Sequence, residues 1–78
     1  MAYHMLFIHT RAYGEPDNGA GWSAELGDRD REVIDFEYDD HRDRGVSRRH
    51  LKIVTFARCP THKQVMAKRD QLNAKGVA

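Results

Sequence analysis

The chain has 78 residues, of which 40 % are hydrophobic and 32 % are charged, and its formal net charge is +1. This length predicts a single small domain over residues 1–78, with a core too small to enclose a substrate pocket, which argues against an enzyme. The near-neutral total also argues against a protein that binds nucleic acid through net charge alone.

The charges are strongly segregated along the chain. Residues 1–43 carry four arginines against eleven carboxylates, a net charge of −7, and residues 44–78 carry nine basic residues against one carboxylate, a net charge of +8. Such an arrangement predicts either a charged partner or a surface whose two halves complement each other.

The compartment is indicated by the cysteine content and by the N-terminus. Cys59 is the only cysteine, which excludes a disulfide within the chain and is typical of a reducing cytoplasm. The first residues lack the basic start and the long apolar stretch of a signal peptide, and no segment approaches the length of about 20 apolar residues that spans a bilayer. We therefore expect a cytoplasmic protein with no membrane contact.

The N-terminal third predicts two strands and a loop. Residues 3–13 contain the apolar run 5–8, which predicts a central strand covered on both faces. Residues 14–21 are rich in glycine, proline and asparagine and predict a loop. Trp22, Ala24 and Leu26 then alternate with polar residues, as in a half-buried strand that ends at Gly27.

The middle of the chain predicts a hairpin. Ile34, Phe36 and Tyr38 alternate with acidic residues, and this period of two indicates a strand over 33–38. The polar segment 39–49, with Gly45 near its middle, is then a long hairpin loop, and residues 51–57 form the next strand, antiparallel to 33–38.

The C-terminal segment predicts a helix. Thr61 and Gln64 have the spacing of a capping box, Val65 and Leu72 lie on one apolar stripe, and Gly76 is a plausible helix stop. The predicted fold is α+β, a four-stranded antiparallel sheet with a C-terminal helix packed on one face (β-β-β-β-α). The expected core consists of Ile34, Phe36, Ile53, Phe56, Val65 and Leu72.

Basic residues between 42 and 58 suggest contact with nucleic acid. Arginine suits bidentate contacts with phosphate, and exposed aromatic rings can stack on unpaired bases. The candidate residues for binding RNA or single strands are Arg44, Arg48, Arg49, Lys52, Arg58, Trp22 and Tyr13. The alternative is a solvated loop whose arginines pair with Asp39, Asp40 and Asp43.

Metal binding and catalysis have weaker support. Cys59 and His62 form a Cys-x-x-His pair that could ligate Zn²⁺ with His41 and His50, but no short-spaced second pair completes the set, so we expect neither a metal nor another cofactor. The same Cys59 and His62 could be drawn as nucleophile and base, and residues 39–41 as a nuclease cluster. Neither has a group to orient it, so we expect no catalytic residues.

The sequence therefore favours a non-enzymatic protein–protein interaction module that docks on a larger protein or nucleoprotein complex through charge. The expected interface residues are Asp35, Glu37, Asp39, Asp40, Arg42, Arg44, Arg48 and Arg49. A small, cysteine-poor chain without a family motif resembles in type the inhibitors that phages and mobile elements encode, anti-CRISPR proteins among them, which implies a host cytoplasm. A nucleic-acid-binding protein and a structural subunit of a larger assembly are the alternatives.

Overall fold

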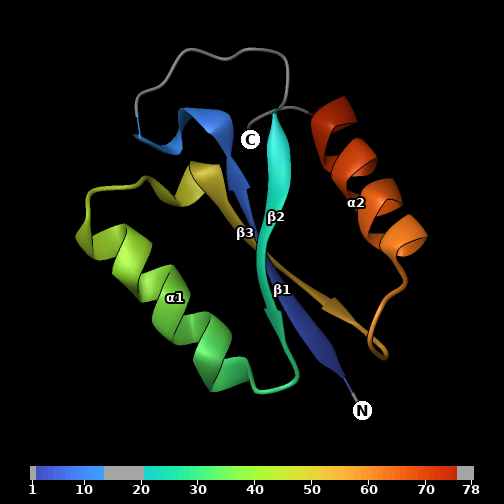
Figure 1. The fold of residues 1–78 in the computed structure, drawn as a ribbon. Helices are drawn as coiled ribbons and strands as arrows, with labels where there is room; N and C mark the ends of the chain where they lie inside the picture. The colour runs from blue at the N-terminus through green and yellow to red at the C-terminus, as the bar shows by residue number, and fades with distance from the viewer. Residues whose placement is uncertain (1, 14–20, 76–78) are drawn as a thin grey trace.

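The computed structural model describes residues 2–13 and 21–75. Within these ranges the chain forms a three-stranded antiparallel sheet in the order β2-β1-β3, where β1 is Tyr3–His9, β2 is Trp22–Asp28 and β3 is Leu51–Phe56. Helix α1 (Arg31–Asp43) and helix α2 (His62–Lys75) lie on opposite sides of this sheet (Figure 1). The α+β class is confirmed, whereas the four-stranded β-β-β-β-α arrangement is wrong.

Strand β1 is central, as its apolar run predicts, and it carries buried residues on both faces. Met5 and Phe7 pack with Trp22 and Leu72 on the α2 side. Leu6, the residue between them, packs on the α1 side with a second cluster. Because successive side chains of a strand point to opposite faces, one strand supplies both halves of the core. Strand β3 pairs with β1 and not with residues 33–38, which corrects the expected hairpin.

Strand β2 contains a bulge that changes which of its side chains face α1 and which face α2. Leu6 pairs with Leu26 and the next residue, Phe7, pairs with Ala24, so Glu25 is an extra residue without a partner in β1. Trp22 packs on the α2 side, but Leu26 packs on the α1 side. The simple alternation expected for Trp22, Ala24 and Leu26 is therefore interrupted, because a bulge shifts the phase of the strand.

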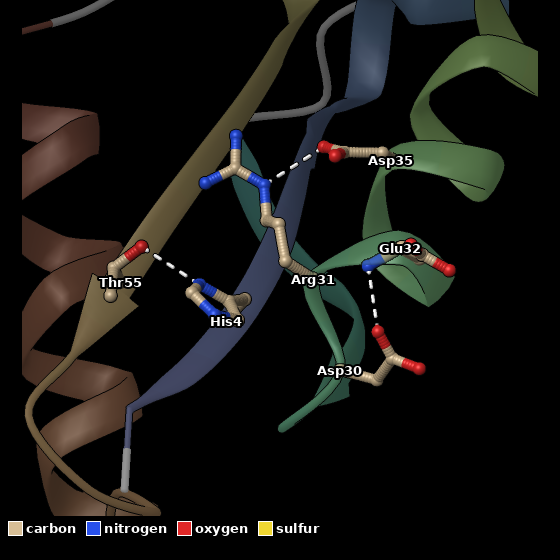
Figure 2. A network of polar contacts seen from close by, with 6 residues as sticks. All are labelled: His4, Asp30, Arg31, Glu32, Asp35 and Thr55. Atoms are coloured by element: carbon tan, nitrogen blue, oxygen red, sulfur yellow. Dashed lines mark hydrogen bonds and ion pairs between the residues drawn. The ribbon is translucent and has the colours of Figure 1, made fainter.

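Residues 33–38 form part of helix α1, so the predicted strand is wrong. The Asp30 carboxylate caps the helix by accepting the Glu32 backbone N–H at 2.9 Å. Arg31 and Asp35, four residues apart, form an ion pair at 2.8 Å (Figure 2). An N-terminal cap and ion pairs at this spacing stabilise a helix. The helix also buries Ile34 and His41 on one side, so it supplies the apolar face that the strand was expected to supply.

The segment 39–49 is not a hairpin loop, because α1 continues through Asp43. It ends where Gly45 adopts a φ of 96°, in the left-handed region that favours glycine. The Gly45 and Val46 N–H groups donate to the carbonyls of Arg42 and His41, at 3.0 and 3.1 Å. This is the hydrogen-bond pattern of a Schellman motif, and it turns Val46 back into the core against Ile34.

Helix α2 begins as the sequence predicts. The Thr61 hydroxyl accepts the Gln64 N–H at 3.2 Å, and the Gln64 side chain accepts the Thr61 N–H at 2.9 Å, which completes the capping box. None of the helices in the described residues is both long enough and apolar enough to span a membrane. The expected loop over 14–21, except for Gly21, and the expected stop at Gly76 lie outside the described residues.

The predicted core is correct for most of its members. Ile34 and Leu72 are buried, and Ile53, Phe56 and Val65 are partly buried against the two clusters. Phe36 is the exception, because its side chain is 76 % exposed on the outer face of α1. A helix advances 100° per residue, so Ile34 and Phe36 point away from each other, whereas a strand would place both on one face.

Candidate functional site

The outer face of α1 presents an exposed aromatic ring among carboxylates. Phe36 is 76 % exposed and Val33, one turn earlier, is 39 % exposed. At 100° per residue, four carboxylates lie within about 60° of the Phe36 direction. They are Glu32, Asp39, Asp40 and Asp43. We call Val33, Phe36 and these four residues the outer face of α1.

A shallow hollow lies beside this face. Its volume is about 390 Å³, and Val33, Phe36 and Leu26 supply its apolar lining. Asp30, Glu32 and Glu37 supply its polar lining. The hollow therefore joins the outer face of α1 to strand β2 and adds apolar surface next to Phe36.

The inner face of α1 carries a buried histidine. His41 is only 4 % exposed, in the last turn of α1. Its Nδ1 shares a hydrogen bond of 2.5 Å with the hydroxyl of Tyr13, which lies in the 3₁₀ turn η1 (Thr10–Tyr13) after β1. The two rings are tilted at 57° with centroids 5.8 Å apart. Tyr13 therefore fixes the orientation of the His41 ring.

The other nitrogen of His41 faces two carboxylates. Nε2 lies 3.5 Å from Oε1 of Glu37, one turn earlier on α1, and 3.9 Å from Oε1 of Glu25, the extra residue of the β2 bulge. Nε2 is buried and has no hydrogen-bond partner in the described part of the chain. We call Glu25, Glu37 and His41 the His41 triad.

Tyr13 also links the triad to Arg44, the residue that ends α1. A hydrogen bond to Tyr13, and then attraction to Asp40, raise the pKa of Arg44 above its usual value. The Arg44 guanidinium forms an ion pair of 2.8 Å with Asp40. Tyr13 and Asp40 therefore hold the Arg44 side chain at the end of α1.

A second histidine cluster lies on the α2 side. His9 is 5 % exposed. Its ring meets the Trp22 ring edge-on, with the centroids 5.2 Å apart, and stacks on the His50 ring, with the centroids 5.6 Å apart. His50 ends the 3₁₀ turn η2 (Arg48–His50). Burial lowers the pKa of His50, and His9, Arg49 and Arg11 lower it further by charge repulsion. This cluster therefore favours a neutral imidazole at His50.

The structure separates the residues that the sequence assigns to a partner interface. Asp39 and Asp40 lie on the outer face of α1, Asp35 pairs with Arg31, and Glu37 belongs to the His41 triad. Arg42 donates to the Val46 carbonyl at 2.7 Å. Arg44 pairs with Asp40, and Arg48 and Arg49 are exposed in η2.

The nucleic-acid candidates are also separated. The Trp22 ring is fully buried, with the Lys52 ammonium 5.6 Å from its centroid, so it offers no free face to a base. Arg58 follows β3, whereas Arg48 and Arg49 precede it, and six residues of strand place them about 20 Å apart. Tyr13 is 50 % exposed, and its hydroxyl bonds to His41.

Of the residues that the sequence suggested as metal ligands (His41, His50, Cys59 and His62), only His41 belongs to a group of three or more potential ligands in the described part of the chain. Cys59 is exposed and His62 begins α2. Among the described residues, the His41 triad is the group of three or more potential ligands whose atoms lie within 4.8 Å of one another. The sequence supplied one signal for it, the spacing of four between Glu37 and His41, but that spacing has meaning only on a helix.

Comparison with known proteins finds no matching family model, no matching curated protein and no matching solved structure. The function must therefore be argued from the geometry of the chain itself.

Proposed function

We propose that this protein is a protein–protein interaction module whose outer face of α1 binds a basic surface with an apolar pocket on a larger protein. The observation that carries the proposal is the exposure of Phe36 among carboxylates. A large aromatic side chain in the centre of a charged ring has the arrangement of a binding hot spot, in which polar groups surround an apolar anchor.

Burial of Phe36 supplies the affinity in this proposal. Its side chain contributes little to the fold, because Ile34 and His41 supply the buried face of α1. Exposed aromatic surface is unfavourable in water and is stabilised when a partner covers it. The hollow between Val33, Phe36 and Leu26 would accept an apolar side chain of the partner in return.

The charge of α1 selects the class of partner. The helix carries six carboxylates against two arginines, so its field attracts a basic surface and repels free nucleic acid. Basic surfaces are typical of proteins that bind nucleic acid. An inhibitor that occupies such a surface in place of nucleic acid is the specific form of the function that this charge favours.

The experiment measures capture of proteins from a nuclease-treated cell lysate, followed by affinity measurement with the purified partner. Phe36→Ser should lower the affinity by roughly tenfold or more, because it removes the apolar anchor. Asp39→Lys should lower the association rate and its dependence on salt. Asp70→Lys, which makes the same charge change on α2, is the matched control and should bind like the wild type.

The nucleic-acid alternative predicts a different pattern. Arg48 and Arg49 are exposed at the start of η2, and reversing both to glutamate would abolish binding to free RNA or DNA. The protein-binding proposal would be contradicted if Phe36→Ser binds the captured material as tightly as the wild type and if nuclease treatment of the lysate abolishes the capture.

A further inference from the structure

The His41 triad has a feature that an ordinary salt bridge does not explain. Nε2 of His41 is buried and lacks a hydrogen-bond partner within the described ranges, although the residue is only 4 % exposed. An unsatisfied buried polar atom is unfavourable, and most buried polar atoms in native proteins have a hydrogen-bond partner, a water or an ion. The two carboxylates nearest to Nε2 face it from farther away than a hydrogen bond.

We propose that Glu25, Glu37 and His41 bind one divalent transition-metal ion of the Zn²⁺ class. The distances from Nε2 to the two carboxylates are 3.5 and 3.9 Å. Ligands bound at about 2.1 Å around a tetrahedral ion lie about 3.4 Å from one another. The three ligand atoms lie within 4.8 Å of one another, so small rotations of the glutamate side chains would complete the site.

Tyr13 supplies the second shell that such a site requires. A histidine that binds a metal through Nε2 donates its Nδ1–H to a neighbouring acceptor, which fixes the ring and its tautomer. The Tyr13 hydroxyl oxygen lies 2.5 Å from Nδ1, within reach to accept that proton when Nε2 binds the ion. Nε2 is then free of the proton and can bind an ion beside the two carboxylates.

The backbone holds the three ligands from two elements. Glu37 and His41 are four residues apart on α1 and therefore lie on the same side of the helix. The bulge in β2 places Glu25 and Leu26 on the same side of the sheet, although neighbours in a regular strand point to opposite faces. Without the bulge, Glu25 would point away from His41.

The donors also match this class of ion. One imidazole nitrogen and two carboxylates are ligands that Zn²⁺ accepts, and two negative charges neutralise a divalent ion. The side chains of Glu25 and Glu37 are 42 % and 31 % exposed, so an ion can reach the site. Three protein ligands leave a fourth position for water.

The test titrates the chelator-treated full chain with Zn²⁺ by calorimetry and repeats the titration with Co²⁺, whose visible absorption reports the coordination geometry. We expect one ion per chain and a higher Tm with Zn²⁺. Glu25→Gln and Glu37→Gln keep the side-chain size and should each lower the affinity at least about tenfold. Tyr13→Phe should weaken binding with the ligands intact.

Two controls separate this site from other residues that bind Zn²⁺. Asp39→Asn removes a carboxylate from the outer face of α1 and should leave the affinity unchanged. Cys59→Ser tests the Cys-x-x-His pair and should also leave it unchanged. The proposal is overturned if Zn²⁺ does not bind, if binding survives in the Glu25→Gln/Glu37→Gln double variant, or if Cys59→Ser removes it. His41 would then be a buried histidine that contacts two carboxylates without a metal ion.

Discussion

The two helices cover opposite faces of one sheet, but they differ in what they contribute. Helix α1 buries Ile34 and His41 and is fastened at both ends, by the Asp30 cap and by the Schellman turn at Gly45. Helix α2 buries only Leu72 among its described residues and is fastened at its start by a capping box. Candidate chemistry is concentrated on α1, on its inner and its outer face, whereas α2 serves mainly to cover Trp22 and Phe7.

The largest expected effect is on stability, when the buried aliphatic side chain of either helix is truncated. Ile34→Ala removes a fully buried side chain from the cluster of Leu6, Val46 and Leu51 and should lower the free energy of unfolding by about 2–5 kcal/mol. Leu72→Ala, at 9 % exposure, should lie at the lower end of that range. Chemical denaturation measures both, and a larger loss for Leu72→Ala would reverse the comparison.

A smaller effect is expected where α2 meets the start of β2. Gly21 has a φ of 64°, and a Cβ there would collide with the side chain of Asn73, whose Oδ1 accepts the Trp22 N–H at 2.6 Å. Gly21→Ala should therefore destabilise the protein by about 1–3 kcal/mol.

The source of this loss can be tested with Gly45→Ala. Gly45 has a φ of 96° but open space around its Cβ position, so this variant carries backbone strain without a collision. If the two variants lose equal stability in chemical denaturation, contact between Gly21 and Asn73 is not the cause.

The sequence predicted the strands β1, β2 and β3 and the helix α2 because their signals are local. The apolar run 5–8, the β-branched residues of 51–56 and the Thr61–Gln64 box each specify one element. The prediction for residues 31–43 was wrong because the alternation of Ile34, Phe36 and Tyr38 fits a strand as well as part of a helix. The decisive signals were the Asp30 cap, the ion pairs four residues apart and the absence of glycine and proline from residue 28 to residue 44.

The candidate site was missed in the sequence because residues 33–38 were assigned to a strand. When residues 33–38 were interpreted as a strand, Phe36 was placed in the core and Glu37 among the interface residues. Neither the outer face of α1 nor the His41 triad could then be assembled. Glu25 was beyond sequence reasoning for another reason, because the bulge that places it beside His41 is set by pairing with β1. Tyr13 reaches His41 across 28 residues of sequence.

A pH effect should test the cluster of His9 and His50 beside strand β1. Burial, with His9, Arg49 and Arg11 nearby, lowers the pKa of His50 from its usual 6.5. The unfolded chain therefore binds a proton at this residue more readily, so stability from His50 is present above about pH 6.5 and is lost as the pH falls through the lowered pKa. His50→Gln should reduce the stability difference between about pH 7.5 and about pH 5.

The control for this measurement is His62→Gln, which removes one exposed imidazole at the start of α2. Chemical denaturation at both pH values gives the difference for each variant. An unchanged difference in His50→Gln would show that acid sensitivity arises elsewhere in the chain.

The smallest expected effect on stability is at Phe36, and it links the comparison of the helices to function. Phe36 is 76 % exposed, so Phe36→Ser removes almost no buried surface and should change the free energy of unfolding by less than about 0.5 kcal/mol. A Phe36 that lay in the core, as the alternation in the sequence suggests, would instead cost about 3–5 kcal/mol when truncated. Chemical denaturation separates these values easily. A variant that is as stable as the wild type and yet loses its protein partner would show that α1 keeps this ring exposed for binding, while a large loss of stability would place residues 33–38 against the sheet as a strand.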